Sequence, residues 1–337
     1  MRMSRMIKNF SRVLFFSFAT LAFLLVGTES GFSQFPKEPV MFMVPSGAGS
    51  GLDVTARTVV ATLQQEKIIP QPWQIFNREG GSGMVGLTEL VNQHRKNPHM
   101  IMVISPIMTF NELSGISKLG YRDVTPIAQL ITDYLILAVQ ENSKFRNLKD
   151  LVDALKKNPT SVKIGGGGVP GSANHLAMLY MLDAAGIPNV KNLPWAAFQG
   201  DGKALIALLG GHIEMASVTL GASISYLEAK KLRSLAVSYE KRMDGPITKD
   251  LATAKEQGAD MVFYMWRGIV GPPDMPDYAV KYYQEILSKM VKTKSWREAL
   301  EKRQWFDSFT TAEFKSFLHN DFMKHKSLLD KMGYYKK

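Results

Sequence analysis

The sequence predicts an α/β protein with two mixed sheets that are flanked by helices and separated by a cleft between two lobes. Three observations favour this fold. Short apolar runs alternate with helical stretches, the alternation occurs in two successive sets, and each set contains a glycine-rich loop between a strand and a helix. Ligands bind at the carboxyl ends of strands in such sheets, so these loops predict a binding cleft.

The first set begins after Pro39. It predicts strands over residues 40–44, 73–76 and 100–105, with helices over residues 53–66 and 84–94 between them. This βαβαβ order indicates a mainly parallel sheet.

The second set predicts strands over residues 134–139, 161–165, 212–217 and 234–238, with a further strand near residues 192–195. Helices are expected over residues 148–157, 174–185 and 202–209, with another that ends at Lys230. The last hundred residues are expected to be largely helical, most clearly over residues 279–290, 295–302 and 311–332. We therefore expect residues 34–135 and 240–337 to form one lobe and residues 136–239 the other.

The N-terminus has the features of a secretory signal peptide over residues 1–33. Four basic residues, from Arg2 to Arg12, precede an apolar run over residues 13–26 that is shorter than the ~20 residues needed to span a bilayer. Small residues such as Ser30 and Ser33 offer cleavage sites. We expect cleavage between Ser30 and Gln34 and a periplasmic protein, and the alternative is an uncleaved anchor.

Charge and cysteine content restrict the partners. The chain carries a net charge of +11, which would suit an anionic ligand, but its basic residues are scattered rather than interleaved with aromatics. We therefore expect no nucleic-acid partner. The absence of cysteine excludes both a disulfide and a lipid-modified cysteine.

The first glycine-rich loop joins the first strand to the first helix. Its residues are Ser46, Gly47, Ala48, Gly49, Ser50, Gly51, Leu52 and Asp53. Glycine lets backbone N–H groups approach a ligand, and the N-terminus of the following helix favours an anion, so a carboxylate could be held without a basic side chain. The alternative is a tight turn in which Asp53 caps the helix.

The second glycine-rich loop starts at Gly165 and has five glycines in seven residues, ending at Gly171. It continues through Ser172, Ala173, Asn174 and His175 into a helix. Ser172 and Asn174 could cap that helix while freed N–H groups face the cleft. We expect no catalysis by Ser172 and His175, because no G-x-S-x-G motif and no orienting carboxylate are present.

Cofactor and metal sites are not expected. The segment from Gly81 to Gly86 fits the G-x-G-x-x-G dinucleotide pattern, but the next strand ends without the acidic residue that would hold a ribose. His94 and His99 lie on either side of Pro98, so they cannot share a helix face as a metal pair.

Several short motifs occur in a specific order along the mature chain. They are Val44-Pro45 with Ala48-Gly49, Asp53 and Ala56-Arg57; Asn77-Arg78 with Gly80, Gly81 and Gly83; Gly165, Gly168, Gly171-Ser172 and His175-Leu176; Phe198-Gln199-Gly200; Leu209-Gly210-Gly211-His212; Leu232-Arg233-Ser234-Leu235-Ala236-Val237 with Lys241-Arg242; and Trp266 with Gly268 and Pro272. In this order the chain resembles the solute-binding proteins of tripartite tricarboxylate transporters, often called Bug receptors.

The resemblance implies a type II periplasmic binding fold that closes on a small organic carboxylate and delivers it to separate membrane subunits. It implies ligand contacts from the two loops, with Phe198, Val218, Thr219 and Trp266 lining or flanking the pocket. We expect a monomer without cofactor or enzymatic activity. The alternatives are an exported serine hydrolase using Ser172 or Ser50, and a receptor that feeds a signalling partner.

Two positions depart from the family pattern. Leu52 stands where a threonine is common, and Val218 stands where many members have an aspartate. Both changes remove polar partners, so we expect an aliphatic or aromatic acid rather than citrate or an amino acid.

Overall fold

The computed structural model describes residues 35–331. The expected signal peptide, residues 1–33, lies outside the described residues. The chain divides into a short unit, Met1–Lys37, and a compact unit, Glu38–Lys337, and all that follows concerns the second. The two lobe boundaries stay a prediction.

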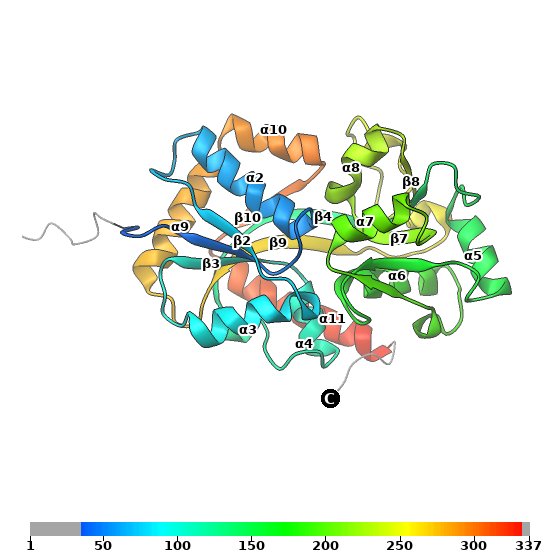
Figure 1. Cartoon of the computed structure of the whole chain (residues 1–337), viewed down its shortest axis with the longest axis horizontal. Coiled ribbons are helices and arrows are strands. Elements are labelled where there is room, and N and C mark those ends of the chain that lie inside the picture. The colour runs from blue at the N-terminus through cyan, green and yellow to red at the C-terminus, as the bar shows by residue number, and fades with distance from the viewer. Residues whose placement is uncertain (1–34, 332–337) are drawn as a thin grey trace, which may run out of the picture. The chain divides into compact units, whose positions relative to one another are not determined.

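The sheet places its strands in the order β2-β1-β3-β9-β4-β7-β5-β6, with β8 and β10 paired to β4 (Figure 1). The strands are β1 (Met41–Val44), β2 (Gln74–Asn77), β3 (Met100–Ile104), β4 (Thr125–Gln140), β5 (Ile164–Gly167), β6 (Ala196–Phe198), β7 (Met215–Thr219), β8 (Leu232–Val237), β9 (Tyr264–Gly271) and β10 (Phe306–Thr310).

Strand β4 belongs to both halves of the sheet. Its first part pairs with β9 and β10, and its second part pairs with β7 and β8, all antiparallel. The outer strands β1, β2 and β3 run parallel, as do β5, β6 and β7. The sheet is therefore mixed and flanked by helices, which confirms the predicted α/β class.

The helices are α2 (Gly51–Gln65), α3 (Met84–Gln93), α4 (Ile107–Leu113), α5 (Leu148–Lys157), α6 (Ala173–Ala184), α7 (Asp201–Leu209), α8 (Leu220–Glu228), α9 (Asp277–Met290), α10 (Lys294–Arg303) and α11 (Phe314–Lys331). Helix α5 shows why the local sequence specifies them. Its buried residues Leu148, Leu151, Val152 and Leu155 have helical spacing, and the side chain of Asn147 accepts from Asp150 N at its start. By contrast, α6 is buried on all sides from Ala173 to Leu182, because it lies within the core.

Three elements were not expected from the sequence. The last hundred residues contain strands β9 and β10 as well as helices, and a short helix, α4, follows β3. The strand expected near residues 192–195 was misplaced, because Val190–Asn192 is a 3-10 turn and the strand begins at Ala196. The strand expected at residues 212–217 begins later, at Met215.

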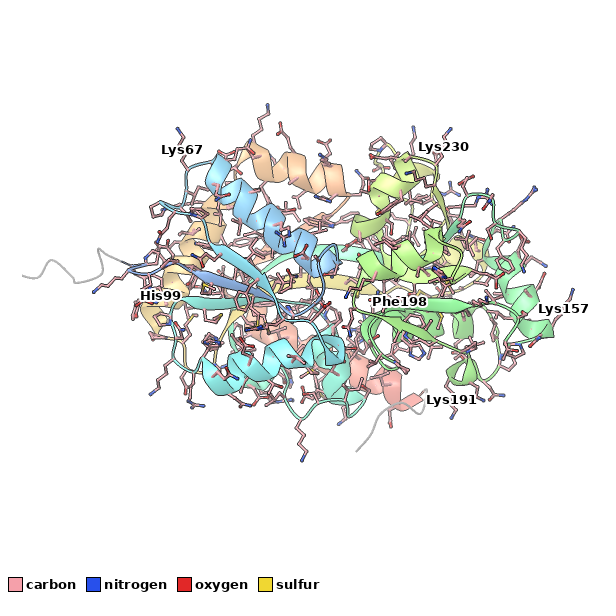
Figure 2. All side chains as sticks on the ribbon, viewed as in Figure 1. Lys67, His99, Lys157, Lys191, Phe198 and Lys230 are labelled. Atoms are coloured by element: carbon pink, nitrogen blue, oxygen red, sulfur yellow. The ribbon has the colours of Figure 1, made fainter. Side chains whose placement is uncertain are left out.

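Basic side chains are distributed over the outside of the molecule. Lys67, Lys157, Lys191 and Lys230 are exposed and point outward in Figure 2, whereas Phe198 lies near the middle. Among the described residues, no helix is both long and apolar enough to cross a membrane.

Candidate functional site

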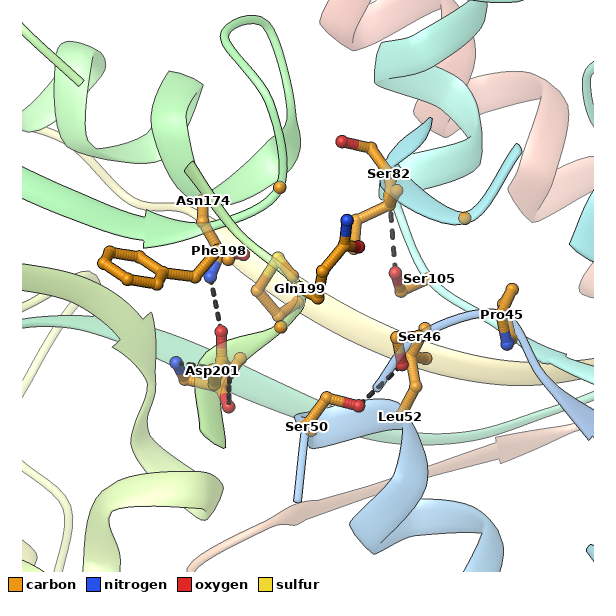
Figure 3. A pocket seen from close by; sticks show the side chains of 18 of the residues that line it. Pro45, Ser46, Ser50, Leu52, Ser82, Ser105, Asn174, Phe198, Gln199 and Asp201 are labelled. Carbon is orange, nitrogen blue, oxygen red and sulfur yellow. Dashed lines mark hydrogen bonds between the residues drawn. The ribbon is translucent and has the colours of Figure 1, made fainter. Parts of the chain in front are cut away.

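A narrow cavity lies where loops from both halves of the sheet meet. Figure 3 shows Asn174, Phe198 and Asp201 on one side and Ser82, Ser105 and Leu52 on the other. The space between the lining residues is about 520 Å³, part of which is open solvent. The volume in which the centre of a water molecule fits is about 50 Å³. Its walls are Pro45, Ser46, Ser50, Gly51, Leu52, Gly80, Ser82, Gly83, Ser105, Ile107, Gly167, Gly168, Asn174, Phe198, Gln199, Gly200, Asp201, Thr219, Met265 and Arg267.

The loop between β1 and α2 is fixed by Asp53 and Ser50. Ser50 caps α2, because its Oγ accepts from Asp53 N at 3.2 Å, and it also bonds Ser46 Oγ at 2.6 Å. The Asp53 carboxylate accepts from Gly49 N at 3.0 Å and from Asn77 Nδ2 at 3.0 Å. Asp53 therefore shapes the loop from behind while Ser46 and Ser50 face the cavity.

The carboxylate of Asp53 is kept ionised by hydrogen bonds from its neighbours. Burial opposes ionisation, but hydrogen bonds from Arg57, Gly49 and Asn77 outweigh it and hold the pKa of Asp53 below its ordinary value. Arg57 Nε lies 2.9 Å from the carboxylate.

The loop between β5 and α6 is fixed in a similar way. Gly171 N donates to His175 Nδ1 at 3.0 Å, and Ser172 Oγ donates to Gly167 O at 3.3 Å. The His175 ring packs edge-on against Trp195 at 4.9 Å, and burial lowers the pKa of His175 to about 4. Both side chains hold the loop, and this arrangement is not that of an activated serine.

Asp201 joins three elements at the cavity wall. One carboxylate oxygen accepts from Asn174 Nδ2 at 2.7 Å, and the other accepts from Thr219 N at 3.1 Å and Thr219 Oγ1 at 2.7 Å. Asp201 is 4% exposed. It therefore ties the first turns of α6 and α7 to the end of β7.

An apolar side pocket opens beside the main cavity. The two share Pro45, Leu52, Ser82, Gly83, Ser105 and Ile107, and the side pocket adds Met84, Leu87, Met102, Ile104, Met108 and Asn111. Leu52 therefore stands between the main cavity and a methionine-rich extension, and methionine side chains adapt to irregular apolar ligands.

Seven of the residues predicted as ligand contacts line the main cavity, namely Ser46, Ser50, Gly51, Leu52, Asn174, Phe198 and Thr219. The other ten do not: Gly47, Ala48, Gly49, Asp53, Gly171, Ser172, Ala173, His175, Val218 and Trp266. Val218 is fully buried in the core, and the Trp266 ring packs edge-on against Phe314 and Phe317. Of the four residues expected to give the cavity apolar surface, Leu52 and Phe198 line it, whereas Val218 and Trp266 do not.

Sequence reasoning missed several lining residues, above all Asp201, Ser82 and Arg267. Ser82 lies in the Gly81–Gly83 turn that the sequence singled out, and its Oγ accepts from Val169 N at 2.8 Å, so it touches the second loop. Arg267 lies on β9, a strand that was not expected. Within the described residues there is no group of three or more His, Cys, Asp or Glu side chains that could hold a metal.

The fold defines a class of protein. The periplasmic binding protein BugD has a similar structure, with a TM-score of 0.81 at 21% identity, covering 90% of this chain and 100% of that chain. MatC from Rhodopseudomonas palustris with bound malate gives 0.78 at 20% identity, covering 88% and 100%. An R. palustris protein with adipate gives 0.79 at 20% identity, covering 89% and 99%. The fold is thus that of periplasmic binding proteins.

Sequence comparison makes the family specific. A family model described as "Tripartite tricarboxylate transporter family receptor" matches residues 56–334, so the chain belongs to this family of solute-binding receptors, as its motifs predicted. A UPF0065 protein of Bordetella pertussis is 26% identical over 311 residues, which cover 90% of this chain and 86% of the relative. The protein BugT of the same species is 23% identical over 270 residues, which cover 79% and 80%.

Proposed function

We propose that this receptor binds a small organic carboxylate between two lobes, outside the cytoplasmic membrane, and delivers it to a tripartite tricarboxylate-type transporter. Its family membership supports the receptor role. The similar structures with malate and adipate make small carboxylates the first class to test.

The observation that carries the proposal is the convergence of helix N-termini on the cavity. Helices α2 and α7 begin at the lining residues Gly51 and Asp201, and α8 begins directly after Thr219. The first N–H groups of a helix lack partners within the helix, and the helix dipole favours negative charge there. Gly221 N in the first turn of α8 already donates to Asp133 Oδ1, so the termini of α2 and α7 are the two that favour an anion in this cavity.

The apolar side pocket favours an acid with an apolar body. Leu52 and the methionines of α3, β3 and α4 can cover an alkyl chain or ring, at about 25 cal/mol per Å² of apolar area removed from water. A third carboxylate, as in citrate, would lose its hydration there without a partner. We therefore expect hexanoate and benzoate to bind more tightly than citrate or aspartate.

We propose binding without turnover. Ser172 and His175, the pair that a hydrolase would need, are engaged with backbone groups of their own loop. The mature protein is expected to leave p-nitrophenyl acetate unhydrolysed above the buffer rate. Hydrolysis that disappears in a Ser172→Ala or Ser50→Ala variant would contradict this expectation.

We also propose export and removal of residues 1–33, giving a monomer in the periplasm. The mass of the protein in a periplasmic extract tests both cleavage and location, because the expected new N-terminus lies between Ser30 and Gln34. An intact chain in the membrane fraction would contradict the cleaved receptor.

Isothermal titration calorimetry with hexanoate, benzoate, malate, adipate, citrate and aspartate tests the receptor proposal itself. Saturable binding of at least one of these acids is the expected result. No binding to any of them would reject a carboxylate receptor, and binding of citrate or aspartate alone would reject only the preference for an apolar body.

A further inference from the structure

Arg267 is a buried cation in the wall of the main cavity. Its side chain is only 2% exposed, and it lies on β9 opposite Ile131 of β4. A Cβ at Gly51 would lie 2.5 Å from Arg267 Nη2, so the guanidinium lies directly beside the first turn of α2. The charged head and a helix N-terminus therefore face the same space.

The guanidinium is only partly hydrogen-bonded. Nη1 donates to Met265 O at 2.8 Å, whereas Nε has no partner among the described residues. The nearest carboxylate oxygen to Nη2, Oδ2 of Asp133, is 3.7 Å away, which is too far for a hydrogen bond. A buried guanidinium presents five donors, and leaving some of them unpaired is costly.

The neighbouring carboxylates do not supply the missing acceptors. Asp133 Oδ1 already accepts from Tyr134 N at 2.8 Å and Gly221 N at 3.2 Å. Both oxygens of Asp201 are occupied by Asn174 and Thr219. Asp133 and Asp201 thus stabilise the positive charge of Arg267 at a distance, while its Nη2 group keeps hydrogen-bonding capacity for an oxygen in the cavity.

We propose that Arg267 binds the carboxylate of the ligand through Nη2, together with the first N–H groups of α2. The apolar body of the acid then lies past Leu52 in the methionine-rich side pocket. This inference rests on the proposed carboxylate-receptor function and adds to it a charge-assisted contact that fixes the orientation of the acid. It makes Arg267 the residue that distinguishes a carboxylate from its neutral amide.

Calorimetry with matched acid and amide pairs tests this role. Hexanoate is compared with hexanamide, and benzoate with benzamide, in wild type and Arg267→Gln. Loss of a hydrogen-bonded charge contact is expected to weaken hexanoate and benzoate by at least about 30-fold, while the amides change little. Arg95→Gln, at an exposed ion pair outside the cavity, is the control and keeps wild-type affinities.

Arg267→Gln leaves Asp133 buried beside a neutral side chain, which lowers the stability of the fold. A second variant therefore separates the effect on folding from the effect on binding. Asp133→Asn combined with Arg267→Gln removes both charges and keeps a polar side chain at each position. A native circular dichroism spectrum with the same loss of hexanoate and benzoate binding supports the role of Arg267 independently of the ion pair.

The outcomes separate this inference from the receptor proposal. If folded Arg267→Gln, or the double variant, binds hexanoate and benzoate as tightly as wild type, Arg267 does not contact the carboxylate. That result overturns the inference but leaves the receptor proposal in place. If wild type binds none of the acids, both are overturned. If the substitution weakens the binding of acids and amides equally, Arg267 shapes the cavity but does not recognise the charge of the ligand, which also overturns the inference.

Discussion

Gly51 is the first residue of α2, and a Cβ there would meet Arg267 Nη2 at 2.5 Å and Thr219 Oγ1 at 3.0 Å. Two other loop glycines act differently. Gly49 and Gly171 have positive φ angles of 77° and 89° and do not line the cavity. Their role is therefore conformational, whereas that of Gly51 is close approach to the site.

Replacing Gly51 with Ala is expected to weaken hexanoate binding by at least tenfold, because the added methyl group displaces the Arg267 head. Gly171→Ala is the contrasting variant. It is expected to cost about 1 kcal/mol of unfolding free energy through its positive φ, with little change in affinity. Calorimetry measures the affinities, and denaturant unfolding measures the stabilities. Unchanged affinity in Gly51→Ala together with a large loss of affinity in Gly171→Ala would contradict this distinction.

His175 predicts a pH dependence of stability. Burial lowers its pKa to about 4, below the 6.5 of an unfolded histidine, so the unfolded chain binds the additional proton. The stabilising contribution is present above pH 6.5 and is lost as the pH falls towards 4, by up to about 3 kcal/mol.

His175→Gln keeps an acceptor for Gly171 N but cannot take up the proton. Unfolding in urea between pH 7 and pH 4 is expected to show a smaller loss of stability in this variant than in wild type. Parallel curves for the two proteins would show that His175 does not contribute to acid sensitivity.

At the scale of elements, the cavity wall is held together where α6, α7 and β7 meet at Asp201. Asp201→Ala leaves Asn174 and Thr219 with buried unpaired donors, and we expect a loss of about 3 kcal/mol of unfolding free energy. Glu79→Ala is the control, since its ion pair with Lys203 of α7 is exposed and contributes little. A loss below 1 kcal/mol in Asp201→Ala would contradict the linking role of this carboxylate.

Local signals were sufficient for some elements and insufficient for others. Helix α5 was predicted with its observed bounds, because helical spacing and the Asn147 cap lie within one short segment. Strand β9 was missed because its sequence includes Arg267 and Gly268, and its conformation depends on pairing with β3 and β4, more than 120 residues earlier in the chain.

The same difference applies to the site. The glycine loops identified the edge of the sheet where the cavity lies, since glycine content is readable along the chain. Arg267 was not identified, because only the register of β9 against β4 brings it beside Gly51. Sequence reasoning also predicted Asp53 and His175 as ligand contacts. In the structure they accept from Gly49 N and Gly171 N and do not line the cavity, and their contact with a ligand stays a prediction.

At the scale of the whole molecule, the cavity is built from both halves of a sheet that share β4. The space open to the centre of a water molecule is only about 50 Å³, which is small for an acid the size of hexanoate, so we expect the loops to separate when the acid binds. We expect the two lobes to open and close around the acid, with β4 and its partner strands crossing between them. Binding then stabilises the closed, folded state.

Thermal unfolding of the mature protein with carboxylic acids tests the central claim most directly. At about a hundredfold its dissociation constant, a bound acid adds about 2.7 kcal/mol of stability, or roughly 4 °C in melting temperature for a chain of this length. We predict such a shift with hexanoate or benzoate and a smaller one with hexanamide or benzamide. Equal melting temperatures with and without every acid, at concentrations up to 10 mM (about a hundred times a Kd of 0.1 mM), would contradict the carboxylate receptor.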